Sequence, residues 1–261
     1  MNKIKVFKKI ATLSLQKDLE YRANFFAMVV SGLLWISVPL IFFKAIYLNV
    51  ENILGWQWAE MLILVGTYMI IDAIMMFLMI HNMGMLQNDI MDGRLDLLLI
   101  KPIDSQFYAS FRTLNYTQIL NVIPGMIVVI IGMNSMSNVL NSINLLGYFL
   151  YLFSGMIIYY CIWFMWTITA FWWPSIQNRE GMFLSTIIMA RFPDDIYQGI
   201  IGMIFKYMFP IALVASPAAK IVTGKLDIVL GILTFGISIV LLIITRFVWN
   251  RGLKAYNSSG N

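Results

Sequence analysis

The sequence predicts an all-α, polytopic integral membrane protein. Of its 261 residues, 60% are hydrophobic and only 12% are charged, whereas a soluble protein carries about a quarter charged residues. The mean hydropathy is +0.79, which leaves too few polar side chains to cover a water-facing surface. Long uncharged runs separate short charged segments. These three observations exclude a soluble globular protein, a disordered chain and a coiled coil.

The first two predicted spans follow a basic N-terminal segment. A helix needs roughly 20 mainly apolar residues to cross the hydrocarbon core of a bilayer. Residues 23–43 contain no charge, and residues 61–80 contain only Asp72. The apolar side chains of the second run outweigh the cost of roughly 3 kcal/mol for one central aspartate, so both runs are predicted to insert.

The next spans come from one long uncharged stretch and from the C-terminal part of the chain. No charged residue occurs from Thr113 to Asn178. Because residues 134–138 and their neighbours are polar, this stretch is predicted to form spans three and four, joined by a short loop. The last span is predicted at Ile228 to Thr245.

Residues 176–225 hold two candidates for a further crossing. Gly181 to Ala190 is short, and Gly199 to Ser216 is interrupted by Lys206 and Pro210. Basic residues gather before span one, between spans two and three, and after the last span, so the positive-inside rule places both termini in the cytoplasm. Cytoplasmic termini require an even number of spans. We therefore predict six spans, with the other candidate re-entrant or interfacial.

Five tryptophans agree with this orientation. Tryptophan rings favour the headgroup level of a bilayer. Trp56 and Trp58 are predicted at the outer face, and Trp172, Trp173 and Trp249 at the inner face.

The N-terminal segment 1–22 is predicted to be an amphipathic helix at the membrane surface. Val6, Phe7, Ile10 and Leu13 recur at helical spacing among lysines. Six of the 18 Lys and Arg residues precede residue 23, and they can meet anionic lipid on the cytoplasmic leaflet. Anchoring to the lipid bilayer is favoured over a dedicated partner site, and the net charge of +5 then indicates no nucleic-acid partner.

The loop after span two, residues 83–112, carries the densest charge. An apolar run follows a predicted turn at Gly93 and stops at Pro102, which ends a helix. This pattern predicts a short dipolar helix that can dock in a groove of another protein, with apolar anchors and charges that fix register. A solvated loop is the alternative. The residues predicted to carry the docking are Asp89, Asp92, Gly93, Arg94, Asp96, Lys101 and Pro102.

Two motifs in the chain resemble a known family. Residues 93–102, GRLDLLLIKP, resemble the G-x-L-D-x-L-L-x-K-P stretch of a subgroup of ABC-2 type permeases, the membrane subunits of ATP-driven exporters. Residues 252–260, GLKAYNSSG, are similar to the G-L-x-x-Y-x-S-x-G ending of that subgroup. The resemblance implies one transmembrane domain over residues 1–261 with a coupling helix in the loop 83–112. It also implies a re-entrant outer hairpin at 193–225, which favours residues 181–192 as the fifth span.

The resemblance further implies partners. The chain has no G-x-x-x-x-G-K-[ST] phosphate loop, so no cofactor is expected in it. ATP and Mg²⁺ would be held by a separate ABC ATPase, present in two copies per transporter. A second permease would complete a homodimer or a heterodimer in the bacterial plasma membrane.

Two further features concern residues inside the predicted spans. A charge such as Asp72 in mid-membrane usually faces the bundle interior. It is expected to be neutralised or hydrogen-bonded by Tyr, Asn or Thr, with lining of a substrate path as the alternative.

Ala23, Ala27 and Ser31 recur every four residues, which permits close helix packing, either within this subunit or against the second permease.

These patterns predict an export permease and not an enzyme. An ATP-independent carrier or channel is the alternative, but it would normally need several intramembrane ionisable groups or broken-helix repeats. A membrane-embedded enzyme needs an acid, a base and a nucleophile, or a set of metal ligands. One His, one Cys and one deep Asp do not supply either set, so no metal site is expected. The sequence does not indicate the substrate.

Overall fold

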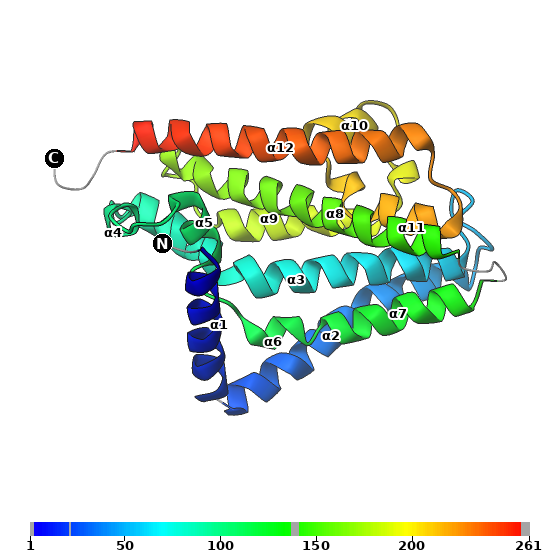
Figure 1. The fold of residues 1–261 in the computed structure, drawn as a ribbon. Helices are drawn as coiled ribbons and strands as arrows, with labels where there is room; N and C mark the ends of the chain where they lie inside the picture. The colour runs from blue at the N-terminus through cyan, green and yellow to red at the C-terminus, as the bar shows by residue number, and fades with distance from the viewer. Residues whose placement is uncertain (1–2, 21, 137–140, 257–261) are drawn as a thin grey trace.

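The computed structural model describes residues 3–20, 22–136 and 141–256. For residues 3–4, 17, 19–20, 22–29, 31, 33 and 35–36 it describes the helical backbone only. Every regular element in these ranges is a helix, apart from an isolated β-bridge between Ile53 and Trp56. The long helices lie alongside one another in a bundle, and α1 crosses one end of it (Figure 1). The predicted all-α class is confirmed.

The element bounds follow the chain in order. The α-helices are α1 (Lys3–Glu20), α2 (Arg22–Tyr47), α3 (Trp58–Met91), α4 (Asp96–Leu99), α5 (Ser105–Phe111), α6 (Tyr116–Ile119), α7 (Val122–Asn134), α8 (Ser142–Ile168), α9 (Arg179–Ile187), α10 (Gly199–Met203), α11 (Ser216–Thr223) and α12 (Ile228–Ala255). Shorter 3-10 or π segments are η1 (Thr169–Phe171), η2 (Ile188–Arg191), η3 (Asp194–Ile196), η4 (Ile204–Met208) and η5 (Ile211–Leu213).

Four helical segments in the described ranges are long and apolar enough to cross a membrane. They are Trp58–Met91, Tyr116–Asn134, Ser142–Phe171 and Ile228–Ala255. These segments contain the predicted spans two, three, four and six. The predicted first span, residues 23–43, lies in α2, and its residues Ala23, Ala27 and Ser31 have side chains outside the described part of the structure.

Helix α3 forms the centre of the bundle. Every residue from Met61 to Ile71 is buried, as expected of a helix surrounded by other helices. Its backbone approaches that of α7 closely, because Gly66 faces Gly125 and Gly132 faces Ala59. Small residues at a helix interface permit such an approach. The resulting α3–α7 pair is the most tightly apposed in the molecule.

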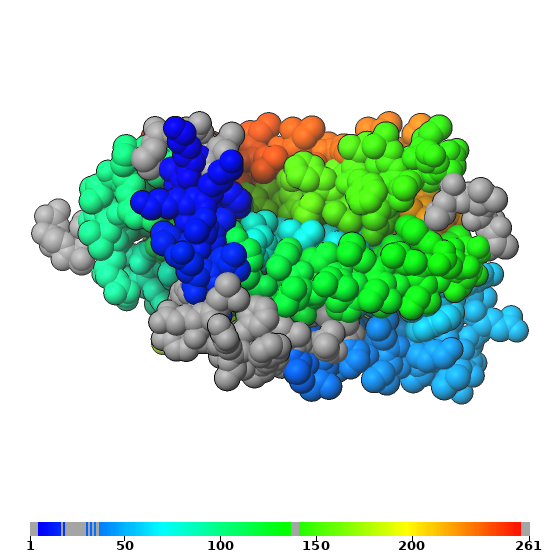
Figure 2. All heavy atoms as spheres, turned by 60° about the horizontal axis from the view of Figure 1, so that its bottom comes forward, coloured from blue at the N-terminus to red at the C-terminus, as the bar shows by residue number. Residues whose placement is uncertain are grey.

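Helix α1 lies on the surface at one end of the bundle (Figure 2). Among its described contacts, the backbone N–H of Leu114 donates to the Ser14 hydroxyl at 3.1 Å, and the N–H of Tyr116 donates to the Asp18 carboxylate at 2.7 Å. Asp18 thereby caps the first turn of α6. The N-terminal helix is therefore bound to the beginning of the third long helical segment.

The chain between Arg179 and Thr223 forms a series of short helices. Helix α9 and η2 together end at Arg191, close to the predicted limit at 192. Residues 193–225 then form a hairpin. Its two ends meet the α2–α3 loop, since Trp56 donates to Asp195 and Lys225 donates to the carbonyl oxygen of Gly55.

The middle of this hairpin reaches into the bundle. Phe205 and Phe209 line the same cavity as Ile162 of α8 and Phe183 of α9. The backbone of Val214 lies directly against Gly155 of α8. These contacts surround the middle of the hairpin with protein.

Two of the five tryptophans are buried inside the protein. The side chains of Trp56 and Trp249 are 1% and 0% exposed, so they cannot face lipid headgroups. Trp56 donates to Asp195, and Trp249 donates to Ser105. Both rings are held inside the protein by an internal hydrogen-bond acceptor. Trp172 and Trp173 are exposed.

The contact between Gly155 and Val214 gives a test of the hairpin packing. A Cβ atom at residue 155 would overlap the carbonyl oxygen of Val214, so we expect Gly155→Ala to lower the free energy of unfolding by about 1–3 kcal/mol. Gly236→Ala on α12 is the matched control, because a Cβ there meets no atom within 4 Å. Denaturant titration of the purified protein in mixed micelles measures both. If Gly155→Ala and Gly236→Ala had the same free energy of unfolding, the close contact between Gly155 and Val214 would be contradicted.

Candidate functional site

The predicted loop 83–112 folds as a helical cap at one end of the bundle (Figure 1). Helix α3 continues without a break to Met91, so residues 83–91 belong to it. The N–H of Arg94 then donates to the carbonyl of Asp89 at 2.9 Å, which closes a turn with Gly93 at φ 68°. Glycine adopts this left-handed conformation without steric cost. The turn directs the chain into α4.

Helix α4 is apolar on two faces. Leu95 and Leu98 are 0% and 3% exposed and fix the segment to the bundle, whereas Leu97 and Ile100 are 65% and 78% exposed. Beside them, Arg94 forms a 2.5 Å ion pair with Asp92, and both side chains are more than half exposed. Exposed apolar side chains next to charges are typical of a protein-binding site. We call Asp92, Arg94, Leu97 and Ile100 the α4 surface.

Contacts below the α4 surface make the cap rigid. Arg112 forms a 2.6 Å ion pair with Asp89, and both side chains are mostly buried. Lys101 donates to the hydroxyl of Tyr108 at 2.5 Å. Pro102 lies between α4 and α5, and Asp104 caps α5 by accepting from the N–H of Phe107 at 2.9 Å. Of the predicted residues, Asp89 therefore supports the cap from a mostly buried position, Lys101 contacts α5 at the exposed surface, and Asp96 begins α4.

The end of α12 holds the cap from a second side. Arg246 donates to the carboxylate of Asp104 at 2.7 Å, and the Trp249 indole donates to the Ser105 hydroxyl at 3.2 Å. The N–H of Leu95 donates to the hydroxyl of Tyr256 at 3.2 Å. We call these contacts of Arg246, Trp249 and Tyr256 the C-terminal clamp.

The C-terminal clamp brings the two sequence motifs together. Tyr256 belongs to the ending 252–260, and its hydroxyl binds the backbone of the stretch 93–102. Burial, with a contribution from the charge of Asp96, raises the pKa of Tyr256, so the hydroxyl stays protonated. Sequence analysis identified both motifs but not their contact. Residues 257–260 of the second motif lie outside the described part.

Asp72 lies in the middle of α3 with two tyrosines. Tyr159 donates to its carboxylate at 2.8 Å and Tyr68 at 3.5 Å. The Arg191 guanidinium lies over the Tyr68 ring, 5.5 Å from its centroid, and its Nε has no hydrogen-bond partner in the described structure. Asp72 remains partly exposed. The carboxylate is thus held by hydrogen bonds from two tyrosine hydroxyls.

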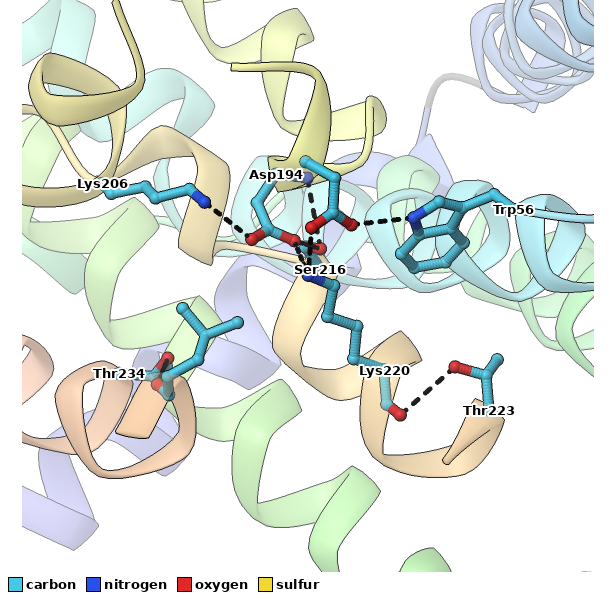
Figure 3. A network of polar contacts seen from close by, with 9 residues as sticks. Trp56, Asp194, Lys206, Ser216, Lys220, Thr223 and Thr234 are labelled. Atoms are coloured by element: carbon cyan, nitrogen blue, oxygen red, sulfur yellow. Dashed lines mark hydrogen bonds and ion pairs between the residues drawn. The ribbon is translucent and has the colours of Figure 1, made fainter. Parts of the chain in front are cut away.

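A second polar site fixes the hairpin 193–225 (Figure 3). Asp194 is 1% exposed; it accepts a hydrogen bond from the Ser216 hydroxyl and forms ion pairs with Lys220 at 2.7 Å and Lys206 at 3.1 Å. Asp195 accepts from Lys220 at 2.8 Å and from Trp56 at 2.9 Å. We call Asp194, Asp195, Lys206, Lys220, Ser216 and Trp56 the hairpin ion cluster.

The hairpin ion cluster favours the charged form of Asp195. Burial alone would raise the pKa of Asp195, but the hydrogen bonds from Lys220 and Trp56, with the charges of Lys220 and Lys206, outweigh it and lower that pKa. The ionised form is therefore the one that the folded hairpin stabilises. Two lysines and two aspartates balance, which satisfies the requirement that buried charges be paired.

Removing one charge of this cluster tests its role. Asp194→Asn leaves two lysines with one exposed carboxylate, and breaking a buried ion pair costs about 3–5 kcal/mol. We expect a large drop in the denaturation midpoint at neutral pH. Asp195→Asn is the matched control; its effect should be smaller, because Asp195 is 39% exposed. A stability loss no larger for Asp194→Asn than for Asp195→Asn would contradict this assignment.

The chain matches one family model over most of its length. The model described as "ABC-2 family transporter protein" matches residues 33–260. No curated protein and no solved structure gave a significant match. The match covers nearly the whole chain and includes the α4 surface, the C-terminal clamp and the hairpin ion cluster. The chain therefore belongs to the ABC-2 transporter family of membrane proteins.

Proposed function

We propose that this chain is the transmembrane permease subunit of an ATP-driven exporter, coupled to a separate ATPase through the α4 surface. The observation that carries the proposal is the exposure of Leu97 and Ile100 on a cap that hydrogen bonds and ion pairs join to α3 and α12. Apolar anchors on a rigid support suit transmission of force better than a mobile loop does. Members of this family generally work with ABC ATPase partners.

The topology that fits this function has six spans and cytoplasmic termini. The spans are α2, α3, α6 with α7, α8, α9 with η2, and α12. The cap and α1 then lie on the cytoplasmic side of a bacterial plasma membrane, where the exposed Lys5, Lys8 and Lys9 meet anionic lipid. The hairpin 193–225 lies at the outer end.

The proposed partners follow from two features of the chain: it has no phosphate loop, and it exposes the α4 surface. Without a phosphate loop of its own, the chain depends on an ATPase that holds ATP and Mg²⁺. Two ATPase copies and a second permease, identical or different, complete the transporter. An ATP-independent carrier would leave the α4 surface without a partner, and Asp72 alone gives little support for ion coupling.

Force applied to α4 has two routes into the membrane domain. One route is the continuous helix α3, which leads from Met91 past Asp72 to Trp58. The other is the C-terminal clamp, through which Arg246 and Trp249 join the cap to α12. Both routes act on helices that pack against α8, so a displaced α4 shifts the bundle as a unit.

A docking experiment tests the proposed function. We expect the wild-type chain to copurify with its ATPase in mild detergent, and the double variant Leu97→Ser/Ile100→Ser to lose most of that binding because the apolar anchors are gone. Affinity pull-down with quantification of the ATPase measures the effect. Charge reversal at Asp92 and Asp96 should also weaken binding.

The control for this test is the same kind of substitution, Leu to Ser, at a residue far from the α4 surface. Leu146 is 63% exposed at the other end of the bundle, at the start of α8, and Leu146→Ser should bind the ATPase as the wild type does. Pull-down of the ATPase at the wild-type level by the Leu97→Ser/Ile100→Ser variant would remove the α4 surface from the coupling role.

Asp72 is proposed to line the substrate path, because it is an acidic residue in the middle of α3 that is partly exposed. Asp72→Asn removes the charge but keeps a hydrogen-bond acceptor for Tyr159, so we expect normal folding and ATPase binding with altered export. Tyr159→Phe is the comparison, since it removes a hydrogen bond and keeps the charge. Efflux assays in cells with and without each variant measure the effect. Unaltered export by Asp72→Asn would leave only a structural role.

A further inference from the structure

A groove on the surface of the bundle separates the C-terminal part of α2 from α7, with α3 at its base. It lies on the face that Figure 2 presents, where α7 runs beside the end of α2. Its volume is about 590 Å³, within the roughly 300–1,000 Å³ typical of small-molecule sites. Its lining includes Leu40, Ile41, Leu62, Val128, Ile131 and the side chain of Lys44.

Lys44 is the one charged residue of this lining. Its ammonium lies over the ring of Trp58, 5.0 Å from the centroid, and no carboxylate of the described residues forms a salt bridge with it. Glu60, two residues beyond Trp58, pairs with Lys225 instead. Lys44 is exposed at the mouth of the groove. The groove therefore combines apolar walls with one cation that faces outward.

The surroundings indicate which kind of molecule can enter. The helix faces on both sides are apolar and exposed: Val38 and Ile41 on α2 are 56% and 66% exposed, and Ile127 and Ile130 on α7 are 51% and 54% exposed. Such faces contact hydrocarbon in a membrane protein. Lys44 lies one turn before the end of α2 at Tyr47, so its ammonium reaches the headgroup level while its stem follows the groove.

We propose that this groove binds an anionic phospholipid, with an acyl chain along α2 and α7 and the phosphate at Lys44. Charge complementarity selects this occupant: one cation at the headgroup end matches one phosphate, and the walls match a hydrocarbon chain. The site is independent of the α4 surface, since it lies at the opposite end of α2 and α3. It adds a lipid-binding site to the permease.

Native mass spectrometry with defined lipids tests the proposal. The full-length protein is released from nanodiscs that contain equal amounts of phosphatidylglycerol and phosphatidylcholine with the same acyl chains, and bound lipids are counted. We expect a preference of about fivefold for phosphatidylglycerol, the effect of one lysine at an anionic surface. Lys44→Gln should reduce this ratio, whereas Lys44→Arg, which keeps the positive charge, should retain it.

A second variant tests the groove itself. Ala45 lines it, so Ala45→Trp fills the space and should remove the bound lipid, while Leu146→Trp on α8 should not. An unchanged phosphatidylglycerol preference in Lys44→Gln would overturn the proposal. So would an Ala45→Trp variant that keeps its lipid but dissociates a permease dimer, because the groove would then be an interface between two copies.

Discussion

The structure depends on the burial of α3, in which Met61 to Ile71 are enclosed on all sides. Its 34 residues extend about 50 Å at 1.5 Å per residue, and α7, α8 and α11 pack around it. Several polar groups lie along this one helix: the cap follows Met91, Asp72 lies in the middle, and Glu60 pairs with Lys225 near the start. Because a buried helix cannot bend without loss of packing, movement at one end must be accompanied by movement along its length.

Charge pairing explains why the short helices after α8 remain ordered. Arg179 is buried and donates to the backbone carbonyls of Trp173 and Ile176, which fixes the loop before α9. Further along, the hairpin ion cluster fixes the return of the chain through α11. In a medium of low dielectric constant, an unpaired charge is costly. Each ionic contact therefore specifies one position for a segment that helical hydrogen bonding alone would not hold.

The sequence was sufficient to predict features that depend on local pattern. Charge-free runs identified the long helices, and the turn at Gly93 with the following Leu residues located α4. Contacts between distant segments were not predictable, such as Arg246 with Asp104, which are 142 residues apart, or Lys220 with Asp194. The burial of Trp56 was not predictable for a related reason: the hydropathy of an indole is the same whether lipid or protein surrounds it, and its partner Asp195 lies 139 residues away in the sequence.

The two attachments of the cap have different mechanical consequences. If α4 were joined to α3 alone, a push would tilt a single helix against its neighbours. The C-terminal clamp adds α12, and α12 packs against α8, which in turn contacts the hairpin at Gly155 and Val214. Displacement of the cap thus reaches the hairpin through α8 as well as through α3. The exposed ion pair of Arg246 with Asp104 contributes little energy by itself, but together with Trp249 and Tyr256 it fixes the position of α12 relative to α4, which is what the transmission requires.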